Sequence, residues 1–213
     1  MNNIKAAIFD LDGTLIDSMG VWQQIDIEYL SKKGHAVPNN LNDEITHLSF
    51  TQTAEYFKKR FSLEDSIEEI MNTWNSMAYN LYKNDVKLKP GALEYLLKLK
   101  SKGIKIGLAT SNSMELLTVT LKSNNAFELF DSITITDEVK KSKSNPDIYL
   151  LAAKKLNVDP KECMVFEDII AAARGAKLAG MKVTGVFDEH SKHQVDILKE
   201  ECDNYIYNYN DLI

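Results

Sequence analysis

The sequence predicts an α/β protein with a doubly wound, Rossmann-like parallel sheet and an inserted helical block, and three observations support this class. Strand-like and helix-like segments alternate from residue 104 onward, which is typical of parallel sheets covered by helices. The run 4–9 is short, apolar and rich in strand formers, as expected of a buried parallel strand. Residues 17–85 show helical patterns without strand patterns, which predicts a helical insertion behind the first strand.

Length and composition argue against several classes of protein. With 213 residues, of which 44% are hydrophobic and 26% charged, the chain can form one large domain or a core with a smaller second unit. The net charge of −6 argues against nucleic acid or an anionic membrane as the main partner. Its apolar runs are too short and too broken by charge for a transmembrane helix, and no signal-peptide pattern is expected.

The remaining bulk features predict a cytoplasmic monomer. Cys163 and Cys202 lie far apart and form no Cys-x-x-Cys motif, so reduced thiols are expected. Because no coiled-coil pattern indicates a partner helix, we expect a monomer.

The helical insertion begins with apolar residues at helical spacing before Gly34, which suits a helix C-cap. Thr51 and Ser62 are the expected N-caps of two later helices. Further helices are expected over 43–47, 51–61 and 64–82. The predicted division places an α/β core at 1–16 and 86–213 and the helical insertion at 17–85.

After the insertion in the sequence, helices and strands are expected to alternate to the end of the chain. Pro90 and Gly91 open this part of the sequence, and Gly103 ends its first helix. Strands are expected over 104–109, 132–136, 163–166, 182–187 and 205–207. Helices are expected over 92–102, 114–123, 146–157, 170–179 and 193–202. This order predicts a parallel sheet with helices on both faces.

Two aspartates follow the first predicted strand directly. Asp10 and Asp12 stand one residue apart and precede Gly13. Ligands of open α/β sheets bind at the carboxyl ends of the strands, which is where these carboxylates are expected to lie. Carboxylates this close repel each other unless a cation or a shared proton holds them, and Mg²⁺ is the simplest such cation. An ordinary Asp-rich turn is the alternative interpretation.

Other predicted strands also end in polar residues. Thr110, Ser111 and Asn112 follow the strand 104–109, where hydroxyl and backbone N–H groups could bind a phosphate, or a hydroxyl could cap the next helix. Glu167 and Asp168 follow the strand 163–166, where they could bind a metal or interact with the helix dipole. Polar groups recurring at one edge of the sheet predict a shared site there.

A cluster of lysines precedes the helix that is expected to start at Pro146. The residues themselves do not distinguish Lys140, Lys141 and Lys143, because a charge run before a helix is usually a solvated surface.

Four segments resemble the motifs of the haloacid dehalogenase (HAD) superfamily, of the β-phosphoglucomutase and phosphoglycolate phosphatase-like type with a helical cap. The segment 9–18, FDLDGTLIDS, resembles the first motif, and 109–112, ATSN, resembles the second. Lys143 stands three residues before Pro146, as the family's lysine does, although Ser144 replaces a common proline. The Glu167–Asp168 pair resembles the fourth motif, with Ile169 and Ala172 at positions where relatives often have Ser and Gly.

The resemblance implies roles for these residues. Asp10 would attack phosphorus and form an aspartyl phosphate, while Asp12 would act as acid and base. Lys143 and Thr110 would bind and neutralise the phosphate, with Ser111 and Asn112 beside them. The implied Mg²⁺ ligands are Asp10, the carbonyl of Asp12, and Asp168, with Glu167 contacting the waters of the metal or orienting the loop.

The implied function is a Mg²⁺-dependent phosphatase for a small phosphorylated metabolite, which could be a sugar phosphate, phosphoglycolate or a nucleotide. A β-phosphoglucomutase-type phosphotransferase is the alternative, although such mutases carry a His and an Arg where our alignment places Trp22 and Phe50. A dehalogenase is disfavoured by Asp12 and Asp168, and a non-catalytic binding protein by retention of all four motifs.

Three further residues have open roles at this stage. His190 and His193 follow the strand 182–187 and are either solvated loop residues or a histidine pair near the site, although two ligands alone do not make a metal site. Trp22 either belongs to the core of the insertion or faces the substrate.

Overall fold

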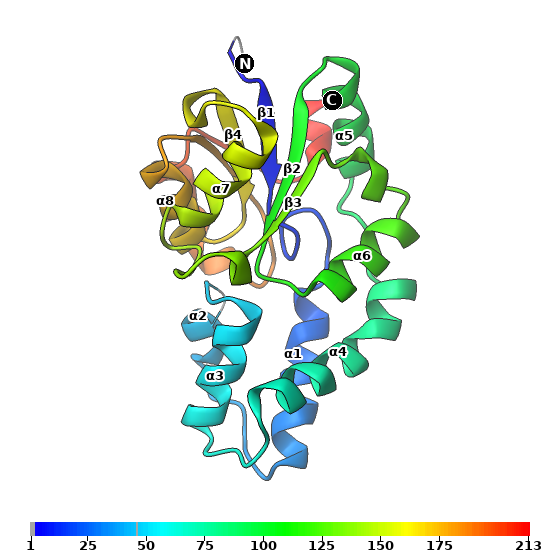
Figure 1. The fold of residues 1–213 in the computed structure, drawn as a ribbon, viewed down its shortest axis with the longest axis vertical. Helices are drawn as coiled ribbons and strands as arrows, with labels where there is room; N and C mark the ends of the chain where they lie inside the picture. The colour runs from blue at the N-terminus through cyan, green and yellow to red at the C-terminus, as the bar shows by residue number, and fades with distance from the viewer. Residues whose placement is uncertain (1–2, 46) are drawn as a thin grey trace.

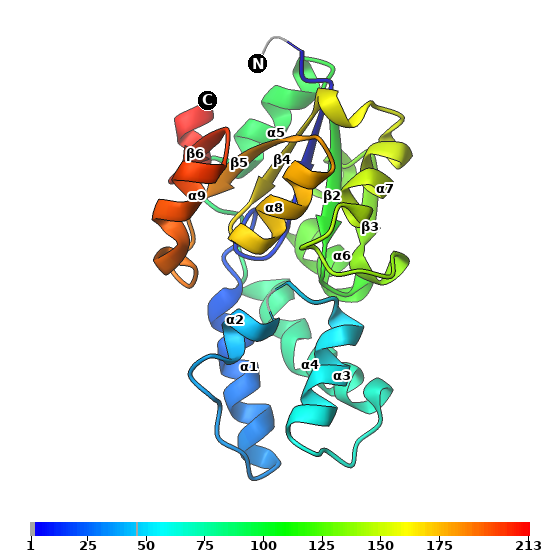
Figure 2. The same cartoon turned by 90° about the vertical axis from the view of Figure 1, so that its left-hand side faces the viewer.

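The computed structural model describes residues 3–45 and 47–213. Its centre is a six-stranded parallel sheet with the strand order β3-β2-β1-β4-β5-β6 (Figures 1 and 2). The strands are β1 (Ala6–Phe9), β2 (Lys105–Thr110), β3 (Ser132–Ile135), β4 (Cys163–Glu167), β5 (Lys182–Val186) and β6 (Asn204–Ile206). The predicted doubly wound α/β fold is confirmed.

Strand β1 lies between β2 and β4, and this position explains its apolar sequence. All four of its residues are buried, because helices cover both faces of the sheet. The side chains of Ala7 and Phe9 belong to one hydrophobic cluster and those of Ala6 and Ile8 to another, as the alternation of a strand requires.

The two clusters are covered by different helices. Helices α5 (Ala92–Ser101) and α6 (Met114–Ser123) contribute to the cluster around Phe9. Helices α7 (Asp147–Leu156), α8 (Ile170–Leu178) and α9 (Val195–Glu201) contribute to the cluster around Ile8. Because helices cover both faces of the sheet, a ligand can reach it at the carboxyl ends of the strands, where sites of such sheets lie.

Four helices form a separate block next to that edge (Figures 1 and 2). They are α1 (Met19–Lys32), α2 (Leu41–Ile45), α3 (Phe50–Arg60) and α4 (Ile67–Asn84). The centre of the block is Trp74, whose ring packs edge-on against those of Tyr29, Phe50 and Phe57. Two connections join the block to the sheet and pair with each other, with Asp17 N donating to Lys87 O at 3.1 Å.

The predicted helix starts in this block were partly wrong. The N-caps of α3 and α4 are Ser49 and Ser66, each with a capping box, and not Thr51 and Ser62. In both cases the N-cap is a Ser that is followed three positions later by Gln or Glu, which is the sequence pattern of a capping box. The prediction chose hydroxyl residues without this pattern. Helix α2 covers 41–45 and not 43–47; position 46 of that prediction lies outside the described residues.

Across the described ranges 3–45 and 47–213, no helix combines the length and the apolar character needed to cross a bilayer.

Candidate active site

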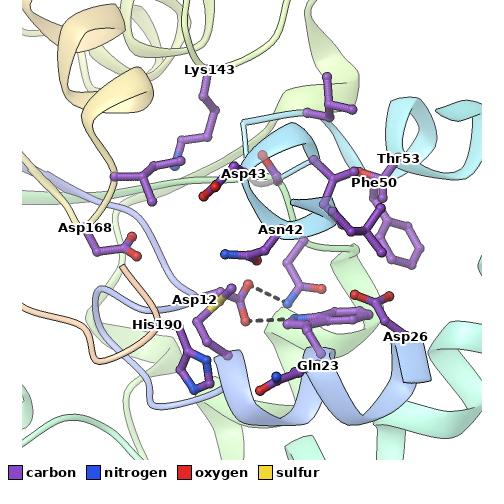
Figure 3. Close-up of a pocket in the computed structure, with 18 of the residues that line it drawn as sticks. Asp12, Gln23, Asp26, Asn42, Asp43, Phe50, Thr53, Lys143, Asp168 and His190 are labelled. Atoms are coloured by element: carbon purple, nitrogen blue, oxygen red, sulfur yellow. Dashed lines mark hydrogen bonds between the residues drawn. The ribbon is translucent and has the colours of Figure 1, made fainter. Parts of the chain in front are cut away.

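A cavity of about 760 Å³ lies where the carboxyl edge of the sheet meets the helical block. Every residue predicted for the site lines it, together with residues of α1, α2 and α3. From the sheet these residues are Asp10, Asp12, Thr110, Ser111, Asn112, Lys143, Glu167 and Asp168. Asp12, Lys143 and Asp168 are labelled in Figure 3. The structure therefore brings together side chains that lie up to about 160 positions apart, as expected for the ends of parallel strands.

Lys143 forms the electrostatic centre of the sheet side of the cavity. Its Nζ lies 2.7 Å from Asp10 Oδ1 and also pairs with Glu167, and all three side chains are buried. Burial alone would lower the pKa of Lys143, but the carboxylates of Asp10 and Glu167 outweigh burial and raise it. Lys143 is therefore a permanent cation beside the Asp10 carboxylate.

Gly175 on α8 makes this position of Lys143 possible. A Cβ atom at Gly175 would lie 2.0 Å from the backbone oxygen of Lys143, so only glycine lets the loop approach the helix this closely. The sequence analysis did not identify Gly175, because a lone glycine within a helical pattern carries no specific signal.

Three carboxylates form a buried cluster next to Lys143. One oxygen each of Asp10, Glu167 and Asp168 can be chosen so that all three lie within 4.8 Å of one another. Glu167 Oε1 accepts a hydrogen bond from Tyr149 at 2.8 Å, whereas its buried Oε2 has no hydrogen-bond partner among the described residues. Burial raises the pKa of Glu167 and that of Asp168, the latter to about 7, with the Asp10 charge adding to the shift. This cluster could bind a metal, because hard oxygen ligands and negative charge that Lys143 only partly offsets suit a divalent cation such as Mg²⁺.

The turn after β1 is shaped by Asp168. Thr14 Oγ1 donates to Asp168 Oδ1 at 3.1 Å. Gly13 has a φ of +76°, and a Cβ there would lie 2.5 Å from Asp168 Oδ2. Glycine is thus required by both its backbone conformation and the nearby carboxylate.

Lys89 holds the same turn from the other side. Its buried ammonium donates to the Gly13 carbonyl, to Phe187 O at 2.7 Å and to Asp188 Oδ2 at 2.9 Å. It links the turn after β1 to the end of β5. Nothing in the local pattern around position 89 identified this role, because its partners lie 76 to 99 positions away.

Asp12 points toward the helical block rather than toward Lys143. Its Oδ1 accepts from Ser18 Oγ at 2.6 Å, from Trp22 Nε1 at 3.4 Å and from the Tyr82 hydroxyl, while Asn112 Nδ2 donates to Oδ2 at 2.8 Å. The dashed lines at Asp12 in Figure 3 mark its hydrogen bonds with other residues that line the cavity. Burial raises the pKa of Asp12 and the Asp10 charge adds to this, although the hydrogen bonds from Ser18, Tyr82 and Asn112 oppose it. Asp12 is thereby tied to α1 and α4 as well as to the sheet.

The residues after β2 divide into a helix cap and cavity-lining groups. Ser113 caps α6 through Leu116 N, so neither Thr110 nor Ser111 is needed as the cap. Thr110 Oγ1 accepts from Asn112 N at 3.0 Å. The buried hydroxyl of Ser111 has no hydrogen-bond partner within the described part of the chain.

The three residues whose roles were left open also line the cavity. The Trp22 ring packs against those of Phe50 and Tyr82, so this residue both packs within the block and faces the site. His190 and His193 line the cavity too, and His193 Nε2 lies 3.3 Å from Asp43 Oδ1. Neither histidine belongs to the carboxylate cluster.

Tyr82 and Tyr149 were missed by the sequence analysis. Helical spacing over 64–82 indicates that Tyr82 is buried, but it does not indicate that its hydroxyl reaches Asp12 from 70 positions away. The same holds for Tyr149 and Glu167, which come from a helix and a strand that pack together only in the folded chain.

Fold and site together define a doubly wound α/β core with a carboxylate-rich site under a helical block. A family model for haloacid dehalogenase-like hydrolases matches residues 7–186. The chain belongs to this family, as the sequence motifs predicted.

Known proteins similar to the chain include phosphatases. YhcW of Bacillus subtilis (strain 168), provisionally named a phosphatase, is 32% identical over 208 residues, covering 92% of this chain and 93% of that protein. Hexitol phosphatase B of Escherichia coli (strain K12) is 29% identical, covering 84% of this chain and 82% of its own length. The crystal structure of β-phosphoglucomutase from Clostridium difficile is 25% identical, with a TM-score of 0.82 over 99% of this chain and 93% of that one. The prediction of an enzyme of the HAD-like phosphatase class is confirmed.

Proposed function

We propose that the protein is a Mg²⁺-dependent phosphatase that hydrolyses a small phosphorylated metabolite through a phosphorylated Asp10. One observation carries the proposal: Lys143 lies between Asp10 and Glu167, beside Asp168, in a cavity that the helical block also lines. A carboxylate nucleophile, a fixed cation and a carboxylate cluster for a divalent ion are the parts that phosphoryl transfer requires.

The metal would be held by Asp10, Asp168 and the carbonyl oxygen of Asp12, with Glu167 orienting this set or contacting the waters of the ion. Glu167 Oε2, which has no partner among the described residues, and the raised pKa of Asp168 support the presence of a cation here. When bound, Mg²⁺ would help to neutralise the charge on the phosphate oxygens.

Residues of the chain would carry out both halves of the reaction. The Asp10 carboxylate attacks phosphorus, and the bond from phosphorus to the leaving oxygen breaks while protonated Asp12 gives that oxygen its proton. As a carboxylate, Asp12 then takes a proton from the water that attacks the phosphorylated Asp10, which releases inorganic phosphate. Such acid–base help contributes about 10²- to 10⁴-fold to the rate.

Phosphate binding is assigned to Lys143 and to the residues after β2. Lys143 offsets the charge of both Asp10 and the phosphate. The Thr110 hydroxyl, which accepts from Asn112 N and lines the cavity, would donate to a phosphate oxygen, with Ser111 and Asn112 beside it.

In this proposal residues 17–85 form a cap over a catalytic core of residues 1–16 and 86–213. The cap limits access of water to the phosphorus and contacts the leaving group. The hexitol phosphatase among the relatives supports a sugar phosphate or a related ester, ahead of phosphoglycolate or a nucleotide. The fold shared with β-phosphoglucomutase favours a phosphotransferase as the second candidate.

The test is phosphate release from a panel of phosphate esters, with and without Mg²⁺. The panel includes β-glucose-1-phosphate, which is assayed for both free phosphate and glucose-6-phosphate. Mg²⁺-dependent phosphate release is expected. Glucose-6-phosphate without free phosphate would favour the mutase instead, and no reaction with any ester would favour a binding protein.

Chelation of Mg²⁺ by EDTA is expected to stop phosphate release reversibly. Binding of the ion should also stabilise the fold, by about 5 °C or more in melting temperature at a concentration about 100 times its Kd. Differential scanning fluorimetry measures this shift without relying on activity. Asp168→Asn should lose most of the shift, whereas an equal Mg²⁺ effect in both proteins would argue against the assigned ligand.

Replacement of Tyr82 by phenylalanine is expected to slow hydrolysis in a manner that depends on the leaving group. Without this hydroxyl, Asp12 loses one of its hydrogen bonds, and a bond to a charged group is worth about 1.5–3 kcal/mol. An alkyl phosphate needs a proton on its leaving oxygen, so its kcat should fall about tenfold or more. Hydrolysis of p-nitrophenyl phosphate, whose leaving group needs no proton, should change much less.

Tyr79→Phe is the matched control, because Tyr79 lies one turn earlier on α4 and only partly buried. Equal losses on both substrates in Tyr82→Phe would indicate a structural role for Tyr82 and not the positioning of an acid.

A further inference from the structure

We propose that the cavity selects phosphate monoesters whose leaving group is uncharged and carries hydroxyls, and that Asp26 is the residue that makes this selection. Asp26 would accept hydrogen bonds from leaving-group hydroxyls and repel a second phosphate. The inference rests on the proposed function, because it concerns the leaving-group end of the same cavity.

The cavity has two chemically different ends. The phosphate end contains Lys143 and the carboxylate cluster on the sheet. The other end, here called the cap end, comes from α1, α2 and α3. Figure 3 shows Lys143 and Asp168 on one side of the cavity, and Asp26, Phe50 and Thr53 on the other. The cap end is defined by Trp22, Gln23, Asp26, Asn42, Asp43, Phe50 and Thr53.

No lysine or arginine lines the cap end within the described residues. The only Lys or Arg found along the whole described lining is Lys143, which is already paired with Asp10 and Glu167. The carboxyl residues of the cap end are Asp26, which is ionised above its pKa of about 7, and Asp43, which lies 3.3 Å from His193 Nε2. A second phosphate bound there would meet like charge without a fixed cation, which suppresses such ligands.

The cap does contain basic residues, but they serve its outer surface. Lys32 pairs with Glu28 at 2.6 Å, and Lys33 pairs with Asp65 at 2.7 Å. Lys58 donates to backbone carbonyls at 63–65. The cap end is therefore negative because these basic side chains form contacts on the outer surface of the cap, and not because the cap contains few basic residues.

Asp26 is the most unusual residue of the cap end. It lies on α1 one turn after Trp22, is half-buried, and makes no hydrogen bond or ion pair with the described residues. Burial raises its pKa to about 7. Because its pKa in the unfolded chain is ordinary, ionisation of Asp26 destabilises the fold increasingly as the pH rises from about 4 to about 7. A carboxylate that lowers the stability of the fold when it ionises is better explained by ligand binding than by packing.

The neighbours of Asp26 suit a hydroxylated carbon chain or ring. The rings of Trp22 and Phe50, with centroids 6.0 Å apart, offer apolar surface for C–H groups. Gln23, Asn42 and Thr53 offer further donors and acceptors for hydroxyls around the same space. Apolar walls with a few polar groups are typical of small-molecule sites, and here the polar groups carry no positive charge.

The test compares wild type, Asp26→Asn and Glu28→Gln on three substrates in Mg²⁺ at pH 8, which is above the Asp26 pKa of about 7. Glu28→Gln removes the same charge from the same helix, but on the exposed face. The substrates are a hexitol 6-phosphate, the bisphosphate of the same hexitol, and p-nitrophenyl phosphate. Wild type should prefer the monophosphate in kcat/KM by about tenfold or more, because the cap end rejects the second phosphate.

Asp26→Asn should reduce this preference about tenfold, through a higher KM for the monophosphate and a lower KM for the bisphosphate. The variant should fold, because asparagine has the same shape, and its melting temperature should gain more at pH 8 than at pH 4. Glu28→Gln should keep the wild-type preference. A wild-type preference for the bisphosphate, or an unchanged preference in Asp26→Asn, would overturn the inference while leaving the phosphatase in place. Failure to release phosphate from all three esters would instead overturn the proposed function, and this inference with it.

Discussion

Replacing Asp10 with asparagine is expected to abolish phosphate release from every ester that the wild type hydrolyses. The amide retains the shape of the side chain but does not attack phosphorus, so the first chemical step is lost. Removal of a catalytic nucleophile typically costs several orders of magnitude, and we expect less than about 10⁻⁴ of the wild-type kcat. Phosphate release at saturating ester and Mg²⁺ measures this effect.

Two further variants make the result specific to the nucleophile. Asp10→Ala should be equally inactive, which excludes residual activity from asparagine that has deamidated back to aspartate. Asp17→Asn is the matched control, because Asp17 lies in the same sequence motif but its side chain is exposed. Turnover by Asp10→Asn near the wild-type rate would disprove the role of Asp10.

Replacing Lys143 with methionine is expected to have the second largest effect, on both turnover and stability. Methionine keeps the length of the side chain but leaves Asp10 and Glu167 buried without their cation. Removing one partner of a buried ion pair typically destabilises a protein by about 3–5 kcal/mol. Loss of one fixed charge that stabilises the transition state should lower kcat by about 10²- to 10³-fold.

Denaturant unfolding and phosphate release separate these two effects. Lys141→Met, on the exposed surface of the same loop, should change neither. The double variant Lys143→Met with Glu167→Gln should recover part of the lost stability, because one buried charge is removed, but it should not recover turnover. Near-normal kcat in Lys143→Met would show that Lys143 does not stabilise the transferring phosphate.

The core was predictable because its signals are local. The apolar run before Asp10 and the repeated strand–helix alternation identified the parallel sheet, and the structure confirms this sheet. The carboxyl ends of parallel strands meet at one edge, so polar residues at those ends could be grouped into a site without a structure. All eight predicted site residues line one cavity for this reason.

Lys143 illustrates the limit of local reasoning. Composition treated Lys140, Lys141 and Lys143 alike, and only the resemblance to a family motif selected one of them. In the fold the difference is large, since Lys143 is buried between two carboxylates and Lys141 is exposed. The close approach of Gly175 that allows this burial comes from a helix 32 positions later.

The contacts that tie the cap to the core were not predictable. Trp22 was predicted to belong to the core of the insertion or to face the substrate, and Tyr82 was not identified at all, yet the polar atoms of both converge on Asp12. Periodicity indicates which face of a helix is buried, but it does not indicate which distant polar atom lies there. Asp26 escaped notice for the same reason, because an aspartate in an amphipathic helix is expected on the exposed face.

The most direct test of the account is to look for phosphate on Asp10 itself. Enzyme mixed with substrate and Mg²⁺ is quenched in acid within one turnover, digested, and analysed by mass spectrometry. We expect the peptide that contains Asp10 to gain the mass of one phosphoryl group, with the group located on Asp10, and this peptide should be absent after EDTA. Rapid turnover without any phosphorylated Asp10, or with the phosphoryl group on another residue, would contradict the proposed mechanism.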